Sequence, residues 1–79
     1  MKRSKGEIIG NVLEVCLIGA SKTRVVYGSD LNFRTVNPYL DSLMSGGFIT
    51  ATERTPTEYK TTDKGKELLA AIRDAYKFF

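Results

Sequence analysis

The stretch Tyr59-Lys-Thr-Thr-Asp-Lys-Gly-Lys-Glu-Leu-Leu69 is typical of a β-strand that runs directly into a helix. Thr62 or Asp63 supplies a side-chain oxygen that suits the cap of that helix. One apolar stripe follows at helical spacing, made of Leu68, Leu69, Ile72, Ala75, Tyr76 and Phe79. We therefore expect a strand over 58–61 and a C-terminal helix over 63–79.

The residues before this junction predict a hairpin and, before it, another helix. Phe48–Thr52 is rich in strand-forming residues, and Pro56 favours a turn in the connection 53–57. Asn32 suits the cap of a helix over 33–45, which Gly46 and Gly47 end. A helical wheel of that segment gives an apolar arc of Phe33, Val36, Leu40, Leu43 and Met44, with Tyr39 beside it. The opposite face carries Arg34, Thr35, Pro38, Ser42 and Ser45.

The N-terminal third predicts two more helices. Ser4 has the spacing of a cap for a first core helix, which we expect Gly19 to stop. Ser21 suits the cap of a short helix over 22–27 ending at Gly28, although Val25-Val26-Tyr27 also has strand propensity. The whole order predicts an α+β, mostly α, winged helix-turn-helix fold, with three helices, a two-stranded wing and a C-terminal helix in one domain, 1–79.

Composition excludes several kinds of site. The 79 residues include 12 Lys and Arg against 9 Asp and Glu, a net charge of +3 that favours an anionic partner. There is no histidine and one cysteine, so we expect no zinc cluster, no cofactor and no enzyme activity. The apolar run Val15–Ile18 is far shorter than a membrane span, and a cytoplasmic location is expected.

The chain resembles the small archaeal winged-helix family of transcriptional regulators, which is related to archaeal chromatin proteins that dimerise through a C-terminal helix. The residues that carry the resemblance are Ser21-Lys-Thr-Arg-Val-Val-Tyr27, Leu31-Asn-Phe33, Tyr39-Leu-Asp-Ser-Leu43, Gly47-Phe-Ile49 and Tyr59-Lys-Thr-Thr-Asp-Lys-Gly65. The resemblance implies binding to double-stranded DNA and regulation of transcription. The predicted C-terminal helix is too short for a long coiled coil, and the short wing argues against deep insertion into the minor groove.

Given this resemblance, the position of each polar residue in the expected fold indicates whether it would contact DNA. The exposed face of the helix over 32–45 would read the major groove through Arg34, Thr35 and Ser42. Asn37 is also included among the predicted DNA contacts, although its place nearer the core edge would also suit packing or capping. Asp41 would repel phosphate unless it accepts from cytosine or pairs with Arg34 or a neighbouring cation. Contacts to the phosphate backbone of DNA are expected from Ser21, Lys22, Thr23, Arg24, Arg54, Thr57 and Lys60.

The last helix predicts a homodimer. Its apolar surface exceeds what the small core needs, and its aromatic end is expected to be exposed in a monomer. The predicted interface consists of Leu69, Ile72, Tyr76, Phe78 and Phe79. The alternative function is a module for protein–protein interaction or assembly, without sequence-specific DNA binding; Asp41, the short wing and the apolar C-terminus favour it.

Overall fold

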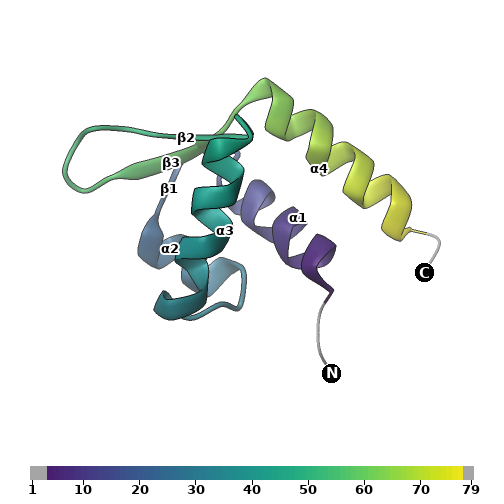
Figure 1. The fold of residues 1–79 in the computed structure, drawn as a ribbon, viewed down its shortest axis with the longest axis horizontal. Helices are drawn as coiled ribbons and strands as arrows, with labels where there is room; N and C mark the ends of the chain where they lie inside the picture. The colour runs from purple at the N-terminus through teal and green to yellow at the C-terminus, as the bar shows by residue number, and fades with distance from the viewer. Residues whose placement is uncertain (1–3, 78–79) are drawn as a thin grey trace.

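The computed structural model describes residues 4–77. Figure 1 shows its elements, which in chain order are α1 (Lys5–Val15), β1 (Ala20–Ser21), α2 (Lys22–Gly28), α3 (Phe33–Ser45), β2 (Ile49–Ala51), β3 (Glu58–Thr61) and α4 (Asp63–Tyr76). Four helices and a small antiparallel sheet thus make up the described chain. This architecture confirms the predicted winged helix-turn-helix fold and its mostly helical α+β class.

All four helices begin at a side chain that accepts a hydrogen bond from a free backbone amide of the first turn. The capping residues are Ser4, Ser21, Asn32 and Thr62. Each has extended backbone angles, as a capping residue requires. The predicted caps Ser4, Ser21 and Asn32 are therefore confirmed, and of the two candidates for the last helix the cap is Thr62. The helices over 33–45 and from 63 onward begin where the sequence places them.

The prediction that α1 continues to Gly19 is wrong. The helix ends at Val15, and Cys16 is its C-cap. The carbonyl of Cys16 accepts from the amide of Gly19 at 3.1 Å and from the amide of Thr61 at 3.0 Å, so β3 provides part of the helix end. Gly19 has a φ of +92°, which turns the chain toward β1.

The sheet contains a third strand that the sequence pattern does not predict. The strand order is β1-β3-β2, and Ala20 in β1 lies opposite Tyr59. A two-residue strand is too short to show a periodic pattern, so only its pairing reveals it. β2 and β3 pair from Ile49 opposite Thr61 to Ala51 opposite Tyr59, and the connection beyond them extends away from the helices (Figure 1).

The core forms where the apolar faces of α1, α2 and α3 meet the sheet. Its buried members include Leu13, Val25, Leu40 and Ile49. Phe33 does not join them: the prediction that it faces the core is wrong, because its side chain is 52% exposed. Phe33 is the first residue of α3, one turn before Val36, the first residue of α3 that is buried.

The β3–α4 junction connects distant parts of the fold. The buried hydroxyl of Thr61 donates to the carbonyl of Leu13 at 2.7 Å, which fixes β3 to the end of α1. The hydroxyl of Thr62 donates to the carbonyl of Gly47 at 2.6 Å while capping α4. Gly65 lies so close to the carbonyl of Phe48 that a Cβ there would be 2.1 Å from its oxygen. The junction therefore holds α4 against the turn between α3 and β2.

Candidate nucleic-acid interface

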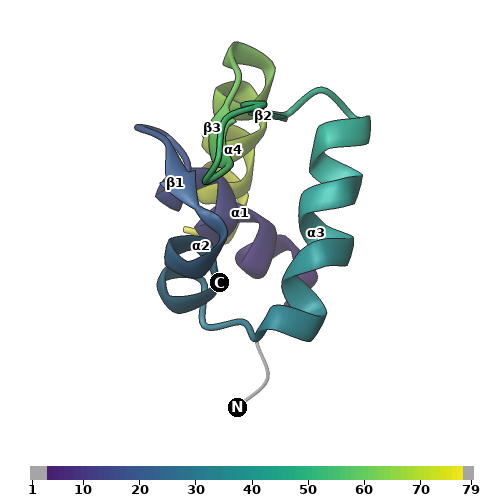
Figure 2. The same cartoon turned by 90° about the vertical axis from the view of Figure 1, so that its left-hand side faces the viewer.

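A turn between α2 and α3 sets the orientation of the exposed helix. Asp30 has a φ of +58°, and the amide of Leu31 donates to the carbonyl of Val26 at 3.0 Å. Asn32 then accepts from the amides of Arg34 and Thr35, each at 2.9 Å, and Thr35 completes a capping box with it. Figure 2 shows this turn at the lower end of α2 and α3, below the strands β2 and β3. The start of α3 is thus rigidly placed.

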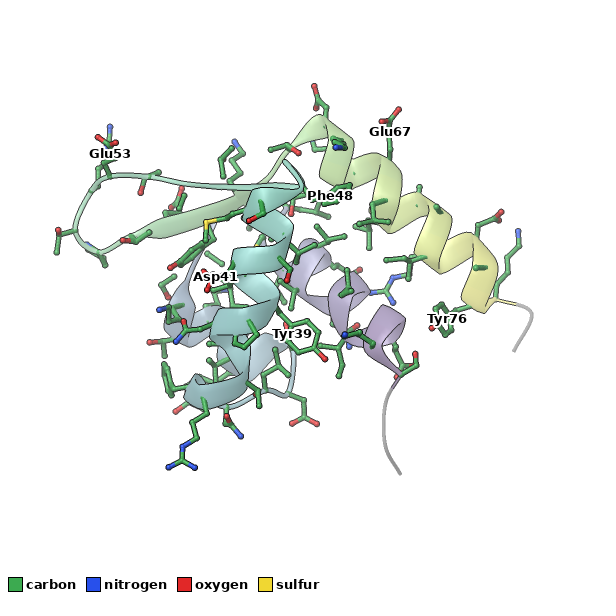
Figure 3. All side chains as sticks on the ribbon, viewed as in Figure 1. Tyr39, Asp41, Phe48, Glu53, Glu67 and Tyr76 are labelled. Atoms are coloured by element: carbon green, nitrogen blue, oxygen red, sulfur yellow. The ribbon has the colours of Figure 1, made fainter. Side chains whose placement is uncertain are left out.

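One exposed stripe of α3 carries three polar side chains. Arg34, Asn37 and Asp41 follow at intervals of three and four residues, so they lie along one flank of the helix. All three are exposed, including Asn37, for which the sequence suggested a position near the core edge. In Figure 3, Asp41 lies on the flank of α3 toward the hairpin. We call these three residues the reading stripe.

The structure separates two predicted reading residues from this stripe. Thr35 and Ser42 are exposed and seven residues apart, on a different flank of α3. The hydroxyl of Thr35 is engaged with the backbone and side chain of Asn32. Ser42 lines a cleft together with Tyr39, and Figure 3 shows Tyr39 on the side of α3 that faces α1. The wheel could not show this division, because it depends on where α1 packs.

The predicted phosphate contacts of α2 surround its first turn. Ser21 is the N-cap and accepts from the amide of Arg24 at 3.3 Å. Lys22 is half-buried, whereas Thr23 and Arg24 are exposed. Arg24 also lines a hollow of about 530 Å³ beside Glu14 at the end of α1. The two cationic side chains of α2 therefore differ in exposure, because Lys22 is half-buried and Arg24 is exposed.

The wing presents both signs of charge. Arg54 and Lys60 are exposed, and Thr57 is half-buried. Glu53, labelled on the hairpin in Figure 3, and Glu58 are also exposed. Two cations and two carboxylates leave 52–60 with no net charge. The wing alone therefore offers little general attraction to a phosphate backbone.

Much of the predicted dimer surface packs within the chain. Leu69 and Ile72 are half-buried against the core, and Ile72 faces the bare backbone of Gly10. The hydroxyl of Tyr76 lies 2.7 Å from that of Ser4, and only 36% of Tyr76 is exposed. Tyr76 is thus still an exposed large side chain, as expected for a monomer, although α1 covers part of it. Phe78 and Phe79 lie outside the described residues.

The described part of the chain holds little reactive chemistry. Burial raises the pKa of the Cys16 thiol from 9.0 to about 11, so this side chain is a protonated core residue at neutral pH. Within 4–77, no three His, Cys, Asp or Glu side chains are grouped in a way that would hold a metal ion. None of the helices described is long and apolar enough to cross a membrane.

Comparison with known proteins finds similarity in both sequence and fold. A family model described as winged helix-turn-helix matches residues 2–78. The uncharacterized protein MJ0287 of Methanocaldococcus jannaschii is 31% identical over 77 residues, which are 96% of this chain and 76% of that protein. The crystal structure of Sso10a-2, a DNA-binding protein from Sulfolobus solfataricus, matches with a TM-score of 0.90 and 31% identity, over 96% of this chain and 81% of that one.

Proposed function

Because the chain belongs to the winged helix-turn-helix family, we propose that it binds double-stranded DNA and regulates transcription. The observation that carries the proposal is the reading stripe on α3, exposed on a helix that the Asn32 capping box holds in place. The major groove of B-DNA is wide enough for an α-helix. A solved relative with the same fold is itself described as a DNA-binding protein, which supports this assignment.

The reading stripe has the chemistry to distinguish bases. A guanidinium such as that of Arg34 bonds O6 and N7 of guanine, and an amide such as that of Asn37 bonds N6 and N7 of adenine. Asp41 accepts from N4 of cytosine, a role in which a carboxylate on this face is favourable. Each bidentate pair discriminates by about 1–3 kcal/mol against the wrong base.

Affinity for the phosphate backbone of DNA comes from a small set of cationic side chains. They are Lys22, Arg24, Arg34, Arg54 and Lys60. If all five neutralised phosphates, the slope of log affinity against log salt would be about −4.5 per protomer. Asp41, Glu53 and Glu58 on the same elements oppose that attraction, so the expected slope is shallower.

A titration of labelled duplexes at salt concentrations from about 50 to 300 mM tests this proposal. Arg34→Ala should lose preference at one base pair by about 1–3 kcal/mol. Lys66→Ala is the matched control, because it removes the same charge from the exposed face of α4. Binding that is absent, or that does not change with salt, would refute the assignment.

Homodimerisation through the C-terminal helix is part of the same proposal. Leu69, Ile72 and Tyr76 keep some exposed surface after packing on α1, and Phe78 and Phe79 follow them in the sequence. A two-fold dimer would present two reading stripes to two half-sites. Sedimentation equilibrium over increasing protein concentration tests it, and a constant monomer mass would exclude the dimer.

A second function is an assembly module that binds protein instead of DNA. The absence of net charge on the wing favours it. Two exposed apolar side chains beside the hollow at α2 favour it as well: Ile18 is 79% exposed and Tyr27 is 78% exposed. Exposed apolar surface of this kind marks protein interfaces. The Arg34→Ala variant separates the two functions, since an assembly module would keep its partner.

A further inference from the structure

A cleft of about 490 Å³ lies between α1, α3 and α4. Half-buried Ile9, Phe48 and Leu68 line it together with buried Leu43. Figure 3 shows Tyr39 and Phe48 on the same side of α3, facing α1 and α4. The volume is within the roughly 300–1,000 Å³ of small-molecule sites, which are mostly apolar with a few polar groups. The cleft therefore has the size and lining of a ligand site.

The polar groups of this cleft are one cation and two hydroxyl groups. They belong to Lys5, Tyr39 and Ser42, and no carboxylate lines the cleft. Lys5 is exposed and forms no ion pair with any residue between 4 and 77. It lies in the first turn of α1, where the helix dipole adds positive potential.

The carboxylates of the same three helices lie outside the lining of the cleft. Glu7 is two residues after Lys5 in α1, a spacing at which helix side chains do not face each other. Asp41 lies on the opposite flank of α3 from Tyr39, and Glu67 points away from the body of the molecule (Figure 3). A negative ligand group beside Lys5 therefore meets attraction without a competing protein carboxylate.

We propose that this cleft binds a small molecule with an apolar body and a single carboxylate. The ammonium of Lys5 pairs with the carboxylate, and the hydroxyls of Tyr39 and Ser42 donate to it from the rim. The apolar body lies against Ile9, Phe48 and Leu68. An uncharged apolar molecule would gain the burial but not the charge-assisted bonds.

Such a ligand would contact α3 beside the reading stripe, through residues that do not belong to it. Pro38, Tyr39 and Ser42 of α3 line the cleft, whereas Arg34 and Asn37 do not. Occupancy of the cleft is measurable without DNA, so the proposed site stands or falls independently of the proposed function.

Nuclear magnetic resonance of the nitrogen-15-labelled chain, without DNA, tests the site. The probe is 4-phenylbutyrate, and the neutral comparison is 4-phenylbutanol, which has the same ring and chain. We expect saturable shifts at Ile9, Tyr39, Phe48 and Leu68 with the acid, and binding of the alcohol about tenfold weaker. Lys5→Gln should reduce the affinity for the acid to that of the alcohol.

The control variant is Lys66→Gln, which removes an equivalent charge from α4 outside the cleft. Its affinity for 4-phenylbutyrate should equal that of the unmodified chain. Equal affinities for acid and alcohol, an acid affinity unchanged by Lys5→Gln in a folded variant, or shifts confined to the hollow at Ile18 and Tyr27 would each overturn the proposal. Absence of saturable shifts up to the solubility of the acid would also overturn it.

Discussion

Replacing Gly65 with alanine tests whether the β3–α4 junction fixes the fold. An added Cβ would lie 2.1 Å from the carbonyl oxygen of Phe48 and 2.6 Å from Cγ2 of Thr61. Ordinary carbon–oxygen contacts are about 3.3 Å or longer, so strand and helix would have to separate by roughly 1 Å. The Phe48 carbonyl belongs to the backbone, so no change of side-chain rotamer relieves this contact.

The expected loss of stability follows from two costs and one smaller gain. Overpacking of this kind costs about 1–3 kcal/mol. The same Phe48 carbonyl accepts from the amide of Thr62 at 2.9 Å, and losing that bond costs about 1 kcal/mol more. Alanine regains up to about 1 kcal/mol through its helix propensity. The net loss is about 1–3 kcal/mol, out of a total expected at about 4–12 kcal/mol for a chain of this length.

Urea denaturation, monitored by circular dichroism, measures this loss of stability as a lower urea concentration at the midpoint of unfolding. Gly10→Ala is the matched control, since its Cβ would meet Cγ2 of Ile72 at 3.1 Å, a methyl group that can move by a few tenths of an ångström. That variant should be unchanged or up to about 1 kcal/mol more stable. A Gly65→Ala protein as stable as the parent, or a Gly10→Ala protein equally destabilised, would refute the reasoning.

Three further outcomes follow from buried polar groups, and each is measured by denaturation. Thr61→Val should cost roughly 1–3 kcal/mol, because it leaves the carbonyl of Leu13 without its buried donor; no loss would show that water replaces it. Ser29→Ala should keep or raise stability, because within 4–77 the buried Ser29 hydroxyl has no hydrogen-bond partner, and a clear loss would reveal an unseen one. Because burial raises the pKa of Cys16, its thiol loses a proton at lower pH in the unfolded chain than in the folded one. The free energy of unfolding should therefore fall between pH 9.0 and about 11, by up to about 1.4 kcal/mol per pH unit. Cys16→Ala should flatten that part of the pH profile, and an unaltered slope would assign it to other groups.

The sequence by itself determined the local structure of this protein. Ser4, Ser21, Asn32 and Thr62 were identifiable as caps because a cap bonds amides two or three residues away. The bounds of α3 and β3 and the order of elements followed from short-range periodicity and turn residues in the same way. These signals were enough to predict the winged helix-turn-helix fold.

Only the tertiary structure decided which surfaces remain exposed. The pairing of β1 with β3, the contact of Tyr76 with Ser4 and the cleft beside Lys5 join residues far apart in the chain, and no local pattern encodes them. The same applies to α3: its periodicity predicted an exposed face, but the packing of α1 put Ser42 in the cleft and left Arg34 outside it. Hydrogen bonds within one turn depend on neighbouring residues, whereas the exposure of a helix flank depends on which distant element packs beside it.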